Sequence, residues 1–255
     1  MIIRYFSDIH LELLHMHKIN VKSIIDKIKP NKEHICILAG DIGNPYSKNY
    51  NIFMNHINTS FKKTFVIAGN HEYYNNFKTI EETNEYLTKY FKDNNLNNIS
   101  FLNNTFEHYE DSCFIGTTLW SNINNPKYKI SDIDSIKDLD IEKYNNLNKT
   151  SRAFLKNVIN TTDTNNNIII THHIPTELLI HPKYLTPKME PYNQWFYSNM
   201  EIFINENGKK IKCWLYGHTH TASNCIINNT RFICNPIGYI DENDENDYDK
   251  TIELY

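Results

Sequence analysis

The sequence predicts an α/β fold whose strands are largely buried. Short runs of β-branched and aromatic residues recur along the chain, and segments with apolar residues at helical spacing lie between them. The strand-like runs are mostly apolar, which is typical of buried strands. Five of these runs are expected to form the central strands: residues 2–6, 35–39, 64–68, 168–171 and 212–216.

Three segments show the apolar spacing of helices. The first covers residues 21–28 and is closed by Pro30, and the other two cover 80–96 and 144–159. Each is long enough to cover part of a sheet. We therefore expect helices on the outside of the strands.

Two regions contain strand-like runs in quick succession, without room for helices. They span residues 99–119 and 224–235, and each predicts a meander, with 251–255 as an additional last strand. Two sheets packed together, with helices outside, accommodate these elements. The polar segments 121–135 and 181–195 are expected to be long loops.

Composition sets limits on the class of protein. A chain of 255 residues with 40% hydrophobic content is expected to fold as one domain over residues 1–255. The net charge of -4 gives no indication of a nucleic-acid or membrane partner. Because no signal peptide or membrane-spanning run is found, we expect an intracellular, cytoplasmic protein. The acidic segment 241–249 is interpreted as a solvated loop, and a calcium site there is the less favoured interpretation.

Polar residues with metal-binding side chains follow each of the five central strands. In open α/β sheets the carboxyl ends of the strands are where ligands bind. A single motif such as Asp-x-His is common by chance, and a histidine at a strand end is often a core residue. Six of the 12 histidines, however, lie in these strand-end motifs. The residues concerned are Asp8, His10, Asp41, Asn70, His71, His172, His173, His218 and His220.

The donor types indicate which metals such a site would hold. Imidazole nitrogen combined with carboxylate and amide oxygen, without thiolate, suits Mn, Fe, Zn, Ni or Co better than Ca or Mg. Glycines at positions 40, 69 and 217 would let the chain turn sharply beside these residues. The sequence therefore predicts a metal site at the carboxyl ends of the central strands.

The ordered motifs SDIHLE, GDIG, GNHEYY, THH and GHTH resemble those of the calcineurin-like metallophosphoesterase superfamily, from residue 7 to residue 220. This resemblance implies a four-layer αββα sandwich with two mixed sheets. It also implies two divalent metal ions, with manganese favoured. In that arrangement Asp8, His10 and His220 hold one ion, Asn70, His172 and His218 hold the other, and Asp41 bridges them.

The resemblance also implies how such a site works. A hydroxide bridging the two ions attacks the phosphorus, and Asp41 is essential because it binds both ions. His71, next to Asn70, is assigned as a general acid or as a stabiliser of phosphoryl charge. Glu72 is interpreted either as orienting a histidine or as a helix N-terminal acid. For His173, a core role and a functional role are equally favoured.

These features predict a metal-dependent hydrolase of phosphomonoesters or phosphodiesters, with nucleotides among the candidate substrates. The first alternative is a nuclease or nucleic-acid phosphodiesterase, although the charge does not indicate it. A more remote alternative is a non-catalytic protein-binding scaffold of the same fold. Substrate choice is expected to depend on loops at 44–60, 121–135 and 181–195.

Overall fold

The computed structural model describes residues 1–240, 242 and 247–254, and within them the strands form two mixed sheets. The first sheet has the order β11 (Thr251–Glu253), β1 (Ile2–Phe6), β2 (Asn31–Ala39), β3 (Phe61–Ile67) and β4 (Ile99–Phe101). The second has the order β5 (Thr105–Tyr109), β6 (Ser112–Thr117), β7 (Asn167–Thr171), β8 (Ile211–Tyr216), β10 (Thr230–Cys234) and β9 (Ser223–Ile227).

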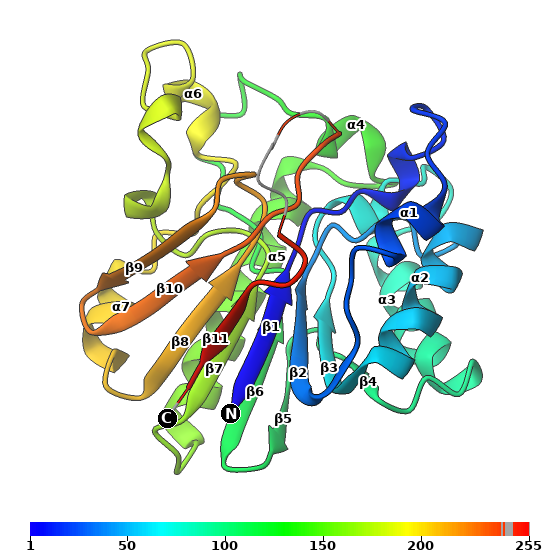
Figure 1. Cartoon of the computed structure of the whole chain (residues 1–255). Helices are drawn as coiled ribbons and strands as arrows, with labels where there is room; N and C mark the ends of the chain where they lie inside the picture. Colours follow the sequence, from blue (N-terminus) through cyan, green and yellow to red (C-terminus); the bar gives the residue numbers. More distant parts are fainter. Residues whose placement is uncertain (241, 243–246, 255) are drawn as a thin grey trace.

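The inner strands of both sheets are parallel. In the first sheet β1, β2, β3 and β4 run in the same direction, and only β11 is antiparallel to its neighbour. In the second sheet β6, β7, β8 and β10 are parallel, and the edge strands β5 and β9 are antiparallel. The carboxyl ends of the inner strands therefore lie at one end of the molecule, the top of Figure 1.

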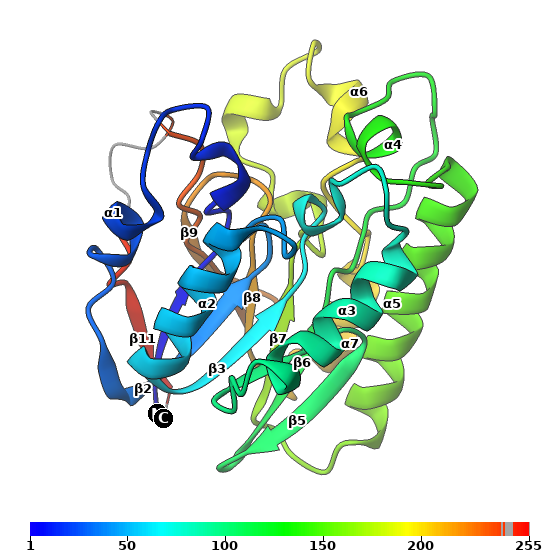
Figure 2. The same ribbon diagram turned by 90° about the vertical axis from the view of Figure 1, so that its right-hand side faces the viewer.

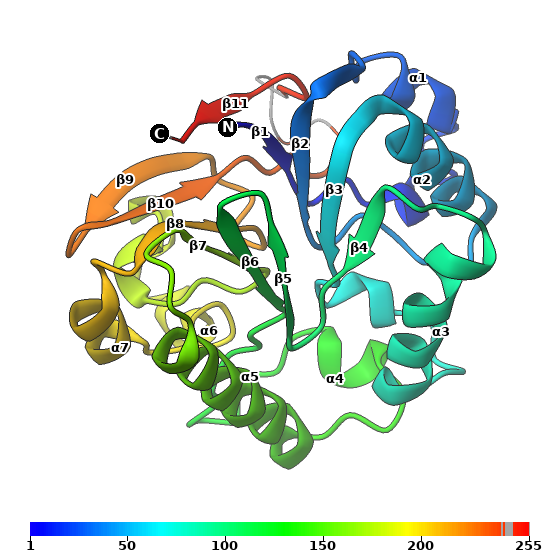
Figure 3. The ribbon, with the colours of Figure 1, turned by 90° about the horizontal axis from the view of Figure 1, so that it is seen from below.

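Helices cover the outer faces of the sheets, giving the four-layer αββα sandwich that the sequence predicts (Figure 2). Figure 3 shows α1 to α3 beside the first sheet and α5 and α7 beside the second. The short α4 and α6 lie beyond the carboxyl ends of the strands. The helices are α1 (Val21–Ile25), α2 (Lys48–Ser60), α3 (Ile80–Asp93), α4 (Asp132–Ser135), α5 (Ile141–Thr161), α6 (Glu190–Asn193) and α7 (Glu201–Asn207), and the 3-10 turns are η1 (Leu11–Leu13), η2 (His71–Tyr73), η3 (Glu177–Leu179) and η4 (Pro182–Tyr184).

An apolar core fills the space between the two sheets. The buried Ile35, Ile37 and Phe65 of the first sheet belong to the same cluster as Phe114 and Ile168 of the second. The rings of Phe65 and Phe114 stack with centroids 4.0 Å apart and an interplanar angle of 15°. Since every inner strand is covered on both faces, these strands are apolar for most of their length.

The five predicted central strands are confirmed, but two other sequence-based predictions are wrong. Residues 44–60 are not a loop, because α2 begins after the Ser47 cap and buries Tyr50, Phe53, Met54 and Ile57 along one face. The abundance of asparagine between these residues hides their helical spacing. The region 99–119 is not one meander, because β4 pairs with β3 in the first sheet while β5 and β6 pair in the second.

The predicted C-terminal meander is confirmed only in part, because residues 224–235 form a hairpin but the last strand, β11, pairs with β1 of the first sheet. Strands β9 and β10 pair around Asn228 and Asn229, whose φ angles are 49° and 65°. Two adjacent positive φ angles match the tight hairpin turn that asparagine tolerates. Among the described residues, none of the helices combines the length and apolar composition needed to cross a bilayer.

Replacing the inter-sheet Phe65 should test how much the sandwich depends on its central core. Phe65→Ala removes a fully buried ring, so we expect the free energy of unfolding to fall by about 3–5 kcal/mol, measured by urea denaturation. Phe106→Ala on the edge strand β5 is the control, because that ring is 48% exposed. Equal losses in the two variants would contradict a core centred between the sheets.

Candidate metal centre

Five strand ends from the two sheets converge on one site. Strands β1, β2 and β3 of the first sheet are followed by Asp8 and His10, by Asp41, and by Asn70, in that order. Strands β7 and β8 of the second sheet are followed by His172 and by His218 and His220. These residues are buried, except for His218, which is partly exposed. The candidates that the sequence predicted therefore lie together, as expected for the carboxyl ends of inner parallel strands.

The backbone is strained where these residues lie. Asp8, His10, Asp41, His218 and His220 all have positive φ angles, between 47° and 69°. Such angles are uncommon for residues other than glycine and cost free energy. Their concentration at one site indicates that the fold holds these side chains in place against a local backbone preference.

Two glycines permit the close approach of neighbouring strand ends. A Cβ atom on Gly69 would lie 2.1 Å from Asp41 Oδ1, and one on Gly217 would lie 2.9 Å from Asp8 Oδ2. The prediction that all three site glycines provide sharp turns holds for Gly40, with a φ of 86°. Gly69 and Gly217 instead provide room for a carboxylate.

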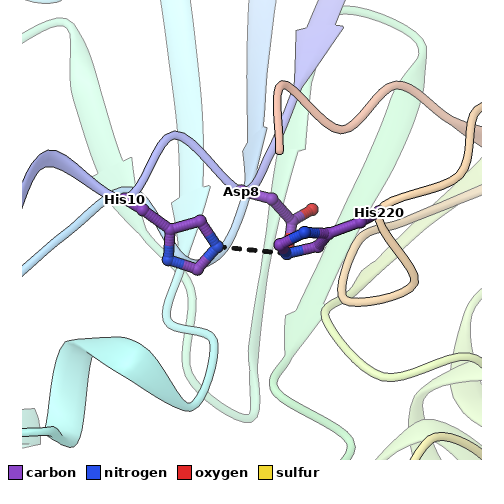
Figure 4. A group of neighbouring side chains, drawn as sticks. All are labelled: Asp8, His10 and His220. Atoms are coloured by element: carbon purple, nitrogen blue, oxygen red, sulfur yellow. Dashed lines mark hydrogen bonds and ion pairs between the residues drawn. The ribbon is translucent and has the colours of Figure 1, made fainter. Parts of the chain in front are cut away.

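The first group of donors comprises Asp8, His10 and His220 (Figure 4). One ligand-type atom from each residue lies within 4.8 Å of the others. His10 Nε2 is 3.1 Å from His220 Nε2, which is 3.5 Å from Asp8 Oδ1. Two imidazole nitrogens and a carboxylate oxygen thus point toward the same small volume.

The second group comprises Asp41, His172 and His218, which also lie within 4.8 Å of one another. His172 Nε2 is 3.2 Å from Asp41 Oδ2, 3.0 Å from Asn70 Oδ1 and 3.2 Å from His218 Nδ1. The amide oxygen of Asn70 therefore joins this group. Asp41 also forms a third close group with His10 and His71, which connects the two clusters.

Three of the imidazoles have their other ring nitrogen bound to an acceptor. His10 Nδ1 lies 3.1 Å from Glu12 Oε1, and His220 Nδ1 lies 2.5 Å from Glu242 Oε2. His172 Nδ1 lies 2.9 Å from the carbonyl oxygen of Ala39. Because carbonyl and carboxylate oxygens only accept, Nδ1 is the nitrogen that donates outward, and Nε2 is the nitrogen that faces the centre of the site.

The charges of the site are strongly coupled. Burial opposes ionisation of Asp41, but the charge of His172 outweighs it, and the pKa of the Asp41 carboxyl is lowered well below its usual range. Burial also opposes protonation of His172, but Asp41 raises the pKa of that imidazole to about 9. The site thus favours an ionised Asp41 carboxylate, which is the form that binds a metal ion.

His71 lies at the edge of this centre and is held by Glu12. Its Nδ1 is 2.9 Å from Glu12 Oε1, the same oxygen that contacts His10, and its backbone N–H donates to Asp41 Oδ1 at 2.8 Å. Burial would lower the pKa of His71, but the Asp41 and Glu12 carboxylates raise it to about 9. Sequence reasoning missed this role of Glu12, although its place two residues after His10 was a usable signal.

Glu72 does not orient a histidine, so that interpretation is wrong. Its buried carboxylate accepts four backbone N–H bonds, from Asp41, Ile42, Gly43 and Gly69, at 2.6–3.2 Å. It thereby joins the loop after β2 to the loop after β3. Burial raises the pKa of Glu72 to about 7 and the Asp41 charge adds to this, whereas the amide donors favour the ionised form.

His173 is a core residue. It is fully buried, its Nδ1 lies 3.3 Å from the Thr118 carbonyl oxygen, and its Nε2 lies 3.1 Å from the Tyr144 hydroxyl. Burial and the neighbouring His172 lower the pKa of His173 to about 3. A neutral imidazole with both nitrogens satisfied supports the core interpretation.

The sequence predicted that the acidic segment 241–249 is a solvated loop, but its described residues make specific contacts. The rest of the segment lies outside the described residues. Glu242 contacts His220, and Asp249 pairs with Arg4 at 2.5 Å and with Lys29 at 2.9 Å. Runs of acidic residues usually face solvent, so the pattern gave no indication of these partners. Asp132 of α4 was also missed; it accepts a hydrogen bond from Asn70 Nδ2 at 2.9 Å.

The donor set fits divalent metal ions. Both groups combine imidazole nitrogen with carboxylate oxygen, and the second adds an amide oxygen. The hydrogen bonds at the far side of three imidazoles are those that metal-binding histidines commonly make. These observations agree with a site for borderline transition metals.

Comparison with known proteins gives a family match over most of the chain. The model of the calcineurin-like phosphoesterase family matches residues 1–222. An uncharacterized protein of Acanthamoeba polyphaga mimivirus is 32% identical over 268 residues, which cover 94% of this chain and 92% of the viral protein.

Solved structures share the fold at low sequence identity. Phosphopantetheinyl hydrolase from Mycobacterium tuberculosis aligns with a TM-score of 0.70 and 15% identity, over 93% of this chain and 89% of that chain. A protein from Thermus thermophilus aligns with a TM-score of 0.54 and 12% identity, over 92% and 88% of the two chains. At these identities the likeness concerns the fold alone.

Glu72→Gln should destabilise the protein more than its small change in volume suggests. The new amide group would direct donors at two of the four backbone N–H groups, so we expect the free energy of unfolding to fall by about 3 kcal/mol or more. Chemical denaturation of the metal-free protein measures this. Glu85→Gln is the control, because that side chain is 76% exposed, and a change within about 0.5 kcal/mol is expected.

Proposed function

Because this chain belongs to the calcineurin-like phosphoesterase family and is a metal-dependent phosphoester hydrolase, we propose that it cleaves a phosphomonoester or phosphodiester with two divalent metal ions. The observation that carries this proposal is the pair of donor groups at the strand ends, connected through Asp41. A carboxylate shared in this way can hold two dications about 3.5–4 Å apart.

The proposed ligands follow the two donor groups. One ion is bound by Asp8, His10 and His220, the other by Asn70, His172 and His218, and Asp41 bridges both. Manganese is the proposed metal, with Fe, Zn, Ni or Co as alternatives, because the donors are nitrogen and oxygen. When bound, the ions supply a water-derived nucleophile at neutral pH and neutralise charge on the phosphoryl oxygens.

His71 is proposed to donate a proton to the leaving oxygen. Its Nδ1 is held by Glu12, so Nε2 is the ring nitrogen left to face the substrate. Its backbone N–H donates to Asp41 Oδ1, which fixes the imidazole beside the proposed bridging residue. A positioned acid of this kind contributes most when the leaving group is poor, since a good leaving group needs no proton.

Glu12 is proposed as a positioning residue for His71. Its Oε1 contacts both His71 Nδ1 and His10 Nδ1, so it connects the proposed acid with a proposed metal ligand. Side chains that fix an imidazole in this way set its orientation and its tautomer. Glu12 therefore acts on the reaction without touching the substrate.

Asp41→Asn should impair both proposed ions together. We expect the metal content of protein reconstituted with Mn²⁺ to fall from two ions per chain toward zero, and kcat/KM to fall by about 100-fold or more. Elemental analysis gives the first value and hydrolysis of aryl esters the second. Asp163→Asn, an exposed carboxylate outside the site, is the control. Normal metal content in Asp41→Asn would contradict the bridging role.

Glu12→Gln should slow the cleavage of alkyl phosphate esters more than that of nitrophenyl esters. For His71→Asn we expect kcat for alkyl esters to fall by about 100-fold, and Glu12→Gln should cause a smaller loss in the same direction. With Mn²⁺ at saturation, which offsets any weaker binding through His10, the double variant should lose no more than His71→Asn alone, because Glu12 then acts through the His71 imidazole. Equal losses for both classes of ester under this condition would assign Glu12 to metal binding instead.

A further inference from the structure

A cavity of about 270 Å³ opens above the candidate metal centre. Its floor includes Asp41, Asn70 and His218, and its walls come from the segments around η2, α4, η4 and α6 and from residues after β10. The wall residues that are neither proposed ligands nor His71 are mainly aromatic or apolar. Five of them are Tyr74, Ile130, Tyr184, Phe196 and Tyr239.

The cavity has no lysine or arginine among its described lining residues. Two of its wall residues, Asp132 and Glu242, are acidic instead. Lys183, next in sequence to Tyr184, holds its ammonium group 4.7 Å from the centre of the Tyr184 ring and does not line the cavity.

This charge pattern limits how many phosphate groups the site can accept. The proposed metal ions would neutralise one phosphoryl group at the floor. Proteins that bind further phosphates, or a nucleic-acid strand, meet the additional charge with lysine and arginine. Here a second phosphate would meet the partly exposed Glu242 carboxylate and no lysine or arginine of the lining, which is unfavourable.

Aromatic rings stand beside the imidazoles of the site. The Tyr74 ring stacks on His71 with centroids 4.1 Å apart, and Phe196 lies 4.8 Å from His218. Tyr239 lies 4.6 Å from His10 and 4.5 Å from His220. The Tyr74 hydroxyl is bound to Asp132 and Ser131, so its ring is the part available to a ligand. The walls therefore favour a planar or apolar organic group.

We propose that the substrate carries a single phosphate ester on an uncharged aromatic or apolar group, and that the site disfavours substrates with additional phosphates, including nucleic-acid strands. This inference rests on the proposed function, since the metal ions bind the one phosphoryl group. The alternative of a nuclease becomes an outcome of the test. Tyr184 is the most informative wall residue, because its ring packs against the Lys183 ammonium group and not against a proposed ligand in the described part of the chain.

The aromatic part of the proposal is tested with Tyr184→Ala in the metal-loaded, full-length protein. The substrates are 1-naphthyl phosphate, its methyl diester and glycerol phosphate. We expect the ratio of kcat/KM for the naphthyl esters to that for glycerol phosphate to fall about fivefold or more, because a stacking surface is lost. Tyr184→Phe keeps the ring and should retain the wild-type ratio. Thermal unfolding checks that both variants are folded.

The charge part is tested with adenosine 5′-monophosphate and adenosine 3′,5′-bisphosphate, which differ by one phosphate. We expect the wild-type KM for the bisphosphate to be about tenfold higher than the KM for the monophosphate. Ile130→Lys, which adds a cation to the wall, should reduce this ratio of KM values. A single-stranded oligonucleotide should inhibit hydrolysis of 1-naphthyl phosphate only weakly.

The outcomes separate the two proposals. If metal-loaded wild-type protein cleaves none of these esters, the proposed function fails. If it cleaves them but prefers the bisphosphate or the oligonucleotide, the inference about the substrate is overturned while the hydrolase proposal stands. If Tyr184→Ala changes kcat/KM equally for all the esters, the aromatic part of the proposal is likewise overturned.

Discussion

The Glu72 carboxylate is the interaction on which the geometry of the site depends. It accepts N–H groups from two loops, Asp41 to Gly43 after β2 and Gly69 after β3, and so fixes the distance between two neighbouring strand ends. A buried carboxylate is stable only when donors surround it, and four amide donors satisfy that condition. With both loops fixed, Asp41 keeps a positive φ of 53° that an unrestrained loop would relax.

The acceptors bound to the outer ring nitrogens of the histidines differ between the two proposed metal positions. Two histidines of the first donor group, His10 and His220, have a carboxylate behind the ring, from Glu12 and Glu242. His172 of the second group has only the carbonyl of Ala39 there. A carboxylate makes the imidazole a stronger donor than a carbonyl does. The two halves of the centre therefore differ in electrostatics although their direct donors are similar.

The sequence predicted the features that depend on local pattern. The five central strands and the seven candidate ligands, Asp41 among them, could be found because apolar runs end in Asp, Asn or His. Helix α2 was missed because asparagine weakens the helical pattern, and the change of sheet after β4 was missed because strand pairing is not a local property. The contacts of Glu72 and Glu242 join distant segments, which spacing along the chain does not reveal.

The two donor groups also connect the sheets to each other. Asp8 and His10 follow β1 of the first sheet, whereas His220 follows β8 of the second. In the same way Asp41, after β2, faces His172, after β7. Each proposed ion would therefore bind residues from both sheets. Since a ligand that binds only the folded state stabilises it, metal binding should strengthen the packing of the sheets as well as supply the chemistry. Catalytic geometry and sandwich stability thus depend on the same strand ends.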